Sequence, residues 1–231
     1  MADIKPTKEQ ESSGSACVLV SGGIDSMVLL SDALGRYANV TPLYIQNHLR
    51  WEEVELVWLK KFIRNIRSPR LKPLKTIELT MRDLYEGHWS LTGIKVPGTL
   101  TMDESVYLPG RNIVLISKAA VYAAMNNISS IEIGVLSGNP FSDSSKTFFT
   151  KMSEVLSLGL GKEIVIKAPF HKLKKEEVVL MGKKLPLECT FSCINPKGYE
   201  HCGECNKCVE RKKAFFAVGL LDKTKYKKAG I

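Results

Sequence analysis

Apolar runs that are typical of buried strands alternate along the chain with segments whose apolar residues recur at helical spacing. The expected strands cover residues 16–20, 40–45, 74–79, 131–135 and 164–168, and the expected helices cover 26–37, 52–67, 112–125, 142–158 and 174–184. Because strands and helices alternate in this way, the pattern predicts a Rossmann-like α/β fold, with a parallel sheet covered by helices on both faces.

Three parts of the chain fall outside this alternation. Residues 82–109 contain Gly and Pro and show no clear period, which predicts a long irregular insertion. Residues 1–15 are polar, and we expect a disordered tail there. The expected organisation is therefore this tail, an α/β domain over 16–185, and a C-terminal segment over 186–231 that packs on the domain.

The loop after the first expected strand carries the clearest chemistry. Residues 21–26 read Ser-Gly-Gly-Ile-Asp-Ser, between an apolar strand and a helix. A Gly-Gly pair at this place lets backbone N–H groups surround an anion, with the positive end of the helix behind it. A phosphate chain is the expected anion, although the loop lacks the Lys of a Gly-x-x-x-x-Gly-Lys-Ser motif. The alternative is an ordinary glycine turn capped by Asp25 or Ser26.

A cysteine cluster near the C-terminus indicates a metal site. Cys202, Cys205 and Cys208 form two overlapping C-x-x-C turns, and Cys193 adds a fourth thiol. Such turns direct sulfurs at one tetrahedral ion, so a small structural zinc module is expected. An iron–sulfur cluster uses the same ligands and stays open as an alternative. The fifth thiol of this region, Cys189, has no assigned role.

Composition narrows the class of protein. The chain has 231 residues, of which 44% are apolar, and a formal net charge of +9. No apolar run approaches the roughly 20 residues that span a bilayer, and the first 15 residues lack the apolar centre of a secretory signal. We therefore expect a cytoplasmic protein without a membrane partner. The positive charge suits nucleic acid or anionic substrates, but it equally suits a solvated surface.

The glycine loop and the cysteines occur together with further motifs in one order. These motifs are Pro109-Gly110-Arg111-Asn112, Ile131–Val135, Lys174–Val178, Thr190–Cys193 and Cys202–Arg211. In this combination the chain resembles the 7-cyano-7-deazaguanine synthase family (QueC-like), which belongs to the N-type ATP pyrophosphatases. The resemblance covers nearly all of residues 16–222. It implies an adenine nucleotide alpha hydrolase-like fold.

The resemblance also implies an activity. The family converts a 7-deazaguanine carboxylate into an amide and then a nitrile, using ATP, Mg²⁺, ammonia and a structural Zn²⁺. The expected partners are therefore the small-molecule deazapurine carboxylate and ammonia. A homodimer is the expected assembly, since family members are often dimers.

By this resemblance, four groups of residues have assigned roles. The residues expected to hold the phosphates are Ser21, Gly22, Gly23 and Ser26. The expected catalytic residues, which orient the loop or Mg²⁺ and stabilise transition-state charge, are Asp25, Arg111 and Lys175. The expected substrate-binding residues are Gln46, His48 and Asp143. The expected zinc ligands are Cys193, Cys202, Cys205 and Cys208.

Two departures from the family pattern leave the substrate open. Where the family commonly has Tyr-Gly-Gln-Arg-His, this chain places Asn47 at the arginine position. Where the family commonly has Asp-Cys-Arg, it places Ser145 at the arginine position. Both positions are expected at the rim formed by the strand ends. Losing two guanidinium groups there would weaken a bidentate grip on a carboxylate or phosphate.

Other functions stay open at this point. A divergent relative would couple a deazapurine or another carboxylate to a different amine or to a macromolecule, in nucleic-acid modification or antiviral defence. A tRNA-thiolating pyrophosphatase would use an iron–sulfur cluster or a persulfide, with Cys189 as the spare thiol. A nucleotide-binding module would bind ATP without releasing pyrophosphate.

Overall fold

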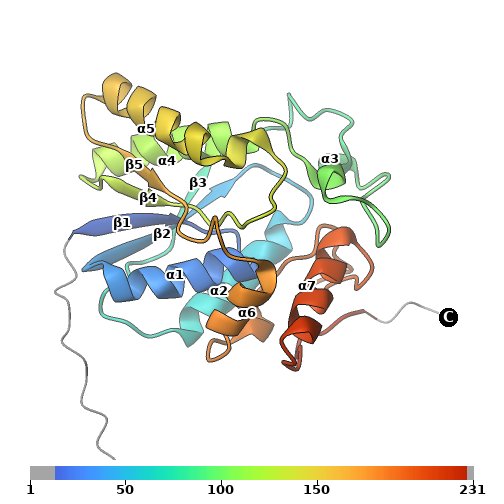
Figure 1. Cartoon of the computed structure of the whole chain (residues 1–231). Coiled ribbons are helices and arrows are strands. Elements are labelled where there is room, and N and C mark those ends of the chain that lie inside the picture. Colours follow the sequence, from blue (N-terminus) through green and yellow to red (C-terminus); the bar gives the residue numbers. More distant parts are fainter. Residues whose placement is uncertain (1–13, 228–231) are drawn as a thin grey trace, which may run out of the picture.

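The centre of the protein is a five-stranded, fully parallel sheet, which a computed structural model describes together with the rest of residues 14–227 (Figure 1). The strands are β1 (Ser15–Leu19), β2 (Asn39–Gln46), β3 (Lys75–Glu78), β4 (Ser130–Glu132) and β5 (Val165–Lys167). Their order in the sheet is β3-β2-β1-β4-β5. The predicted α/β fold is confirmed. Four strands begin and end within one residue of their predicted bounds, whereas β4 ends three residues earlier than predicted.

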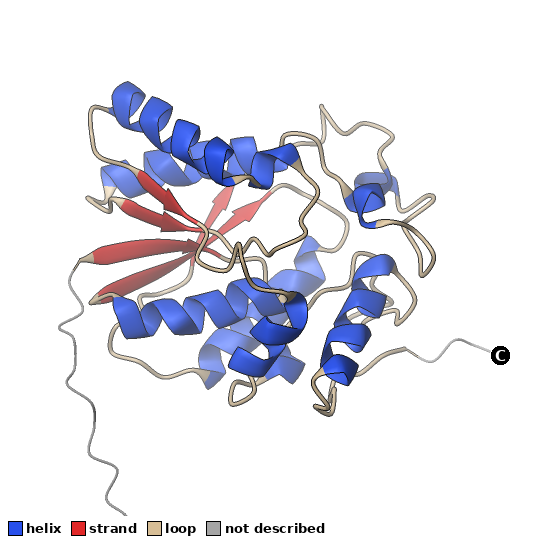
Figure 2. Ribbon diagram, in the orientation of Figure 1, coloured by secondary structure: helices blue, strands red, loops and turns tan. Residues whose placement is uncertain are grey.

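Helices cover both faces of the sheet (Figure 2). On one side lie α1 (Ile24–Arg36), α2 (Glu52–Asn65), α6 (Lys175–Met181) and α7 (Asn206–Ala217), and on the other lie α4 (Arg111–Met125) and α5 (Lys146–Leu160). Helix α5 is shorter than predicted, because a 3₁₀ turn (η2, Ser142–Ser144) precedes it. The hydroxyl of Ser145 accepts the Phe148 N–H at 3.1 Å and so starts the helix anew.

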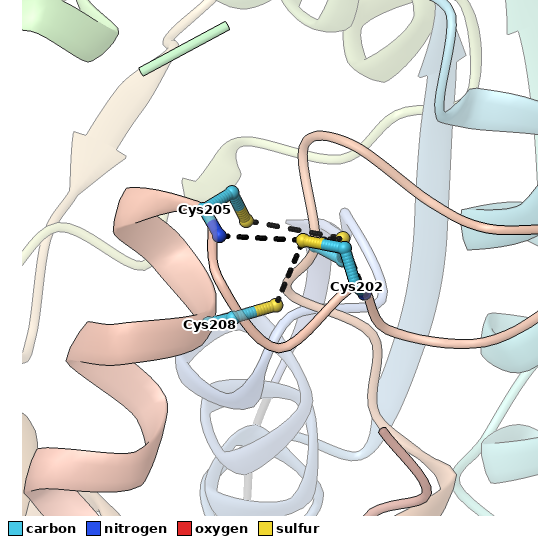
Figure 3. Close-up of side chains that lie close together, drawn as sticks. Cys202, Cys205 and Cys208 are labelled. Carbon is cyan, nitrogen blue, oxygen red and sulfur yellow. Dashed lines mark hydrogen bonds between the residues drawn. The ribbon is translucent and has the colours of Figure 1, made fainter. Parts of the chain in front are cut away.

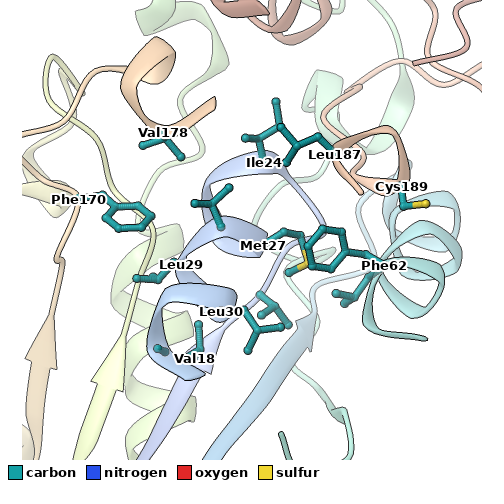
Figure 4. Close-up of a cluster of buried hydrophobic side chains, with 14 of the residues drawn as sticks. Val18, Ile24, Met27, Leu29, Leu30, Phe62, Phe170, Val178, Leu187 and Cys189 are labelled. Atoms are coloured by element: carbon teal, nitrogen blue, oxygen red, sulfur yellow. The ribbon is translucent and has the colours of Figure 1, made fainter. Parts of the chain in front are cut away.

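One apolar core lies on each side of the sheet. Alternate residues of β1 serve each of them, with Val18 facing the α1 side and Cys17 the α4 side. On the α1 side, Met27, Leu30 and Phe62 are buried against each other (Figure 4). On the other side, alanines of α4 let that helix pack closely on the sheet. Because both faces of the sheet are covered, the strand sequences are continuously apolar.

The segments outside the alternation have little regular structure. Residues 82–109 contain only one short helix, α3 (Trp89–Thr92), and one 3₁₀ turn, η1 (Asp103–Val106). A further 3₁₀ turn, η3 (Leu187–Cys189), precedes the cysteine cluster. Ser15, the last residue of the expected tail, is the first residue of β1, and residues 1–13 lie outside the described part. Among the described helices, none has the length and apolar character needed to cross a membrane.

A buried ion pair fastens the end of α1 to the sheet. Glu132 of β4 is fully buried, and both of its carboxylate oxygens accept hydrogen bonds from the Arg36 guanidinium at 2.6 Å. The Tyr37 hydroxyl donates a third bond to it at 2.8 Å. Asp32 also contacts Arg36, at 2.8 Å, but its side chain is 34% exposed. These contacts anchor α1 at its end far from the glycine loop.

We expect Glu132→Gln to lower the free energy of unfolding by about 2–3 kcal/mol. Breaking a buried ion pair by removing one partner typically costs about 3–5 kcal/mol, and water compensates part of that loss at Arg36. Asp32→Asn is the matched control, and its expected loss stays below about 0.5 kcal/mol because the pair is exposed. Urea unfolding followed by circular dichroism measures both. Equal losses in the two variants would contradict this account.

Candidate functional site

A cavity of about 320 Å³ lies at the carboxyl ends of the central strands. Val20 follows β1, Ile45 lies at the end of β2, and Gly134 follows β4, and all three line it. The carboxyl ends of parallel strands are the usual place for a ligand in such sheets. The cavity therefore lies where the strand order predicts one.

The glycine loop forms one wall of this cavity. Gly22 has φ of +76°, and a Cβ atom on it would lie 3.2 Å from the backbone oxygen of Glu55, so only glycine fits without strain. The Ser26 hydroxyl binds within the loop, donating to Gly23 O and accepting from Ser21 N, each at 3.1 Å. No described side chain caps the start of α1. The alternative of a glycine turn capped by a side chain therefore does not apply. The first N–H groups of α1 lie at the edge of the cavity without a side-chain partner.

Four charged side chains meet beside the loop. Lys175 Nζ lies 2.8 Å from Asp25 Oδ2 and 3.7 Å from Glu210 Oε1. Glu210 also contacts Lys207 Nζ at 2.7 Å, and all four residues line the cavity. Burial alone would lower the pKa of Lys175, but the two carboxylates outweigh it and raise that pKa. Burial would likewise raise the pKa of Glu210, but Lys175 and Lys207 hold it at about 2. Lys175 and Glu210 are therefore both charged at neutral pH.

The cavity lining also contains Arg111 and a buried carboxyl group, that of Glu55, which lies against Gly22 of the loop. Arg111 begins α4 directly after Gly110, and its buried Nε atom has no hydrogen-bond partner among the described residues. Burial raises the pKa of Glu55 to about 8, although the charge of Arg111 opposes this. Tyr44 donates a hydrogen bond from its hydroxyl to Glu55 Oε2 at 2.8 Å. Glu55 therefore holds a proton at neutral pH inside the cavity wall.

Asp143 has a structural contact in addition to its place on the cavity wall. Its Oδ2 atom accepts the Asn112 N–H at 3.1 Å, and the Asn112 amide donates to the Asp143 carbonyl oxygen at 3.0 Å. These bonds fasten the start of α4 to the loop after β4. Asp143 thus positions the helix that carries Arg111.

Gln46 and His48 do not join the other predicted site residues. Both line a second hollow of about 720 Å³ beside α2, and the His48 ring pairs with Glu78. Asn47, between them, is fully buried and donates its amide to Leu79 O at 2.7 Å. Neither Asn47 nor Ser145 lines the first cavity. Asn47, directly after β2, ties that strand to the segment after β3, and Ser145 caps α5, so the described contacts of both residues are structural.

The remaining wall is aromatic. The 82–109 insertion contributes Trp89 and Tyr107 to the cavity lining. Tyr107 stacks on Phe141 with ring centroids 4.8 Å apart, and Trp89 stacks on Trp51 at 5.7 Å. Flat apolar surfaces of this kind suit a planar heterocycle. The cavity thus combines a charged end near the glycine loop with an aromatic end.

The four predicted metal ligands come together in one buried cluster. The sulfur atoms of Cys193, Cys202, Cys205 and Cys208 all lie within 4.8 Å of one another. Figure 3 shows Cys202, Cys205 and Cys208 with their sulfurs turned inward. Four thiolates at the usual Zn–S distance would be about 3.8 Å apart, and three of the observed separations are 3.5, 3.8 and 3.9 Å. The cluster therefore fits one tetrahedral Zn²⁺ better than a cluster of several irons.

The cysteine cluster also holds the aromatic wall in place. The Asn206 N–H donates to Pro97 O at 3.0 Å, and the Asn206 amide donates to Thr101 O at 3.1 Å. The Thr99 hydroxyl donates to Glu204 O at 2.9 Å. The insertion is thus bonded to the turn that carries three of the four cysteines. A metal that fixes this turn would also fix the insertion.

Cys189 lies away from the cavity lining. It is buried in the core beside Phe62 and Leu187 (Figure 4). Burial raises the pKa of its thiol. A persulfide carrier needs an accessible thiolate, so this placement disfavours the thiolation alternative.

The sequence interpretation missed Glu55, Lys207 and Glu210. A signal for Glu55 was present, because a carboxylate occurs on the apolar stripe of α2 formed by Leu59 and Phe62. For the other two, the only signal was their spacing of three residues on the helix that follows the cysteines. That spacing is common on solvated helices, so it carried no functional information by itself.

Comparison with known proteins gives one consistent family. The family model described as "Queuosine biosynthesis protein QueC" matches residues 15–219. A 7-cyano-7-deazaguanine synthase of Leptospira interrogans is 34% identical, with 94% of this chain and 93% of that protein covered. One of Picrophilus torridus is 36% identical, with 91% of each covered. Among solved structures, a 4-thiouridine synthetase–RNA complex with bound ATP has a TM-score of 0.51 at 18% identity, covering 89% of this chain and 50% of that one. This last likeness supports the fold alone.

We expect the purified protein to contain one zinc and no iron per chain by elemental analysis. Cys202→Ser should lose most of the zinc, whereas Cys189→Ser, the matched control outside the cluster, should keep it. Removing the metal with a chelator should expose residues 82–109 to limited proteolysis, because the turn that binds this insertion loses its anchor. A metal-free protein that resists cleavage there would contradict this link.

The proton on Glu55 predicts a pH dependence. The pKa of Glu55 is about 8 in the folded protein against an ordinary 4.5, so between these values only the unfolded state releases the proton. Stability therefore falls as the pH rises through this range. Gln does not titrate, so the free energy of unfolding of Glu55→Gln should not fall in this way. Its difference from the wild type should therefore increase in favour of the variant between about pH 5 and about pH 8, by on the order of a few kcal/mol. Urea unfolding at both pH values measures the difference. The exposed neighbour variant Glu53→Gln should show no such gain, and a gain equal to that of Glu55→Gln would refute the assignment.

Proposed function

Because the chain belongs to the QueC family of queuosine biosynthesis proteins, we propose that it is an ATP-dependent carbon–nitrogen ligase that forms 7-cyano-7-deazaguanine. Its substrate in this proposal is a 7-deazaguanine carboxylate, which it converts with ammonia first to the amide and then to the nitrile. The observation that carries the proposal is the cavity in which the glycine loop, Lys175 and Arg111 lie together with an aromatic wall.

The chemistry explains why such a site needs ATP. A carboxylate is a poor electrophile because its leaving group would be oxide. In the proposed first step a carboxylate oxygen attacks the α-phosphorus of ATP, pyrophosphate leaves, and an acyl adenylate forms. Ammonia then attacks the acyl carbon, AMP leaves, and a proton is released, which gives the amide. The amide oxygen then attacks the α-phosphorus of a second ATP and pyrophosphate leaves. Loss of AMP and of the two N–H protons gives the nitrile.

The residues around the loop fit the first step. In the proposal, backbone N–H groups of Gly22 and Gly23 hold the pyrophosphate, together with the hydroxyls of Ser21 and Ser26. Lys175 and Arg111 stabilise the negative charge that develops as pyrophosphate leaves. The buried Nε of Arg111, which has no described partner, supports a role toward a ligand.

Asp25 is the group that fits a magnesium ion. Its Oδ2 atom contacts Lys175, while its buried Oδ1 atom has no partner among the described residues. A carboxylate oxygen with a free lone pair beside a phosphate loop suits Mg²⁺, which prefers oxygen ligands. The ion, when bound, screens the charge of the phosphates. We therefore propose that Asp25 orients the loop and contributes to holding Mg²⁺.

We assign the aromatic end of the cavity to the deazapurine ring. Trp89, Tyr107 and Phe141 offer planar surfaces there, and Asp143 lies beside them on the wall. Closing such a wall over the ring would keep water from the acyl adenylate. Gln46 and His48 face the second hollow, so a contact between them and the substrate would require ligand to reach beyond the first cavity. We place the reaction in the cytoplasm and propose a homodimer as the assembly.

The proposed activity predicts a defined product. With ATP, Mg²⁺, ammonia and carboxy-deazaguanine, mass spectrometry should detect the nitrile and AMP. Lys175→Gln should reduce the turnover number by about 10²–10³-fold, because one source of transition-state stabilisation is lost. Lys151→Gln is the matched control, since Lys151 is an exposed lysine on α5 that pairs with Glu154. It should keep the full activity.

The same measurement separates the alternatives. An amide that accumulates without nitrile, or a purine coupled to another amine or macromolecule, would favour the divergent relative. ATP bound without pyrophosphate release would favour a binding module. No consumption of the purine in any of these assays would overturn the substrate assignment.

A further inference from the structure

Lys175 is held by carboxylates from two distant parts of the chain. Asp25 belongs to the glycine loop and the first turn of α1, whereas Glu210 belongs to α7, which begins directly after the zinc-ligand candidate Cys205. The Lys175 side chain is only 15% exposed, and the Glu210 side chain is 30% exposed. Helix α7, which follows the cysteine turn, therefore forms part of the cavity wall and contacts Lys175 there.

The geometry of an ammonium group gives this arrangement a consequence. A lysine ammonium has three N–H donors on a flexible stem with four rotatable bonds. Lys175 donates a hydrogen bond to Asp25 Oδ2 at 2.8 Å, and Glu210 Oε1 attracts the same ammonium group from 3.7 Å. At least one N–H donor remains for a ligand in the cavity, which Lys175 itself lines. With Asp25 alone, the lysine could rotate about that one contact.

We propose that Glu210 is a positioning residue, which holds the Lys175 ammonium toward the phosphates of a nucleotide bound at the glycine loop. The cysteine cluster then has a second role besides supporting the insertion, because it fixes the start of α7, the helix that places Glu210 beside Lys175. Lys207, three residues earlier on the same helix, binds the other oxygen of Glu210 at 2.7 Å and so fixes its carboxylate. This inference rests on the ATP-binding part of the proposed function and not on the identity of the purine.

The direction in which anion affinity changes when Glu210 is removed distinguishes a positioning role from a general effect of its charge. A carboxylate that merely lies near an anion site repels the anion, so its removal would tighten anion binding. A carboxylate that orients a phosphate-binding lysine has the opposite effect, because its removal releases the lysine. Binding of a simple phosphate anion to variants of Glu210 therefore tests the proposal directly.

The experiment is calorimetric titration of the zinc-loaded, full-length protein with inorganic pyrophosphate. We expect the Kd of Glu210→Gln to rise about 5- to 10-fold, as the loss of part of one charge-assisted contact implies. Glu154→Gln is the matched control, because it removes the same kind of Lys–Glu pair, three residues apart, on the exposed face of α5. Its Kd should equal that of the wild type. Unchanged or tighter binding by Glu210→Gln would overturn the proposal.

Two further variants keep the test decisive. Glu210→Asp retains the charge but shortens the side chain, so it should also weaken pyrophosphate binding. If Glu210→Asp binds pyrophosphate as tightly as the wild type, the proposal is overturned, even if Glu210→Gln fails to fold.

The second variant is a double substitution. In a Lys175→Gln background, Glu210→Gln should weaken pyrophosphate binding no further. An additive loss would mean that Glu210 does not act through Lys175. Zinc content and melting temperature check that each variant is folded.

The outcome is distinguishable from that of the proposed function. If the wild type binds no pyrophosphate, both the phosphate site and the role of Glu210 are refuted. If it binds pyrophosphate and the variants behave as expected, but no purine is consumed, only the substrate assignment fails.

Discussion

The common direction of the strands is the constraint on which the site depends. Because β1, β2 and β4 run parallel, their carboxyl ends meet at one edge, and each chain segment that leaves the sheet there must turn beside the same cavity. Gly22 turns close against the backbone of α2, with a positive φ of +76°. The residues that follow β4 and the start of α4 complete the enclosure. Groups that are more than 100 residues apart in sequence, such as Asp25 and Lys175, thus line one cavity.

The cysteine cluster extends this arrangement beyond the sheet. Apolar packing anchors α7 to the α1 side of the core through Ala214 and Phe215, while the cysteines shape the turn before it. That turn bonds to the 82–109 insertion on one side and leads into Lys207 and Glu210 on the other. A single compact unit therefore supports both the aromatic and the charged end of the cavity. A small core alone could not order an insertion with so little regular structure of its own.

The sequence predicted the parts of the structure that follow from local patterns. Continuous apolar runs located the strands, glycine spacing located the loop after β1, and C-x-x-C spacing located the cysteine cluster. It failed where tertiary contacts decide. Asn47 was expected at the rim of the strand ends, but its amide bond to Leu79 O could not be foreseen, because that contact depends on the pairing of β2 with β3. Glu210 could not be placed in the site because its neighbour Lys175 is 35 residues earlier, and no local pattern links the two.

Two of the bonds between the insertion and the cysteine turn are made by main-chain atoms of the insertion. Asn206 contacts the carbonyl oxygens of Pro97 and Thr101, which are present whatever side chains stand at those positions. This part of the docking is therefore insensitive to the side chains at those two positions. Trp89, in contrast, lines the cavity and also stacks on the buried Trp51, so exchanging it would change the cavity wall and the packing of the insertion together. The shape of this wall and the stability of the insertion thus depend on the same side chain and cannot be altered independently there.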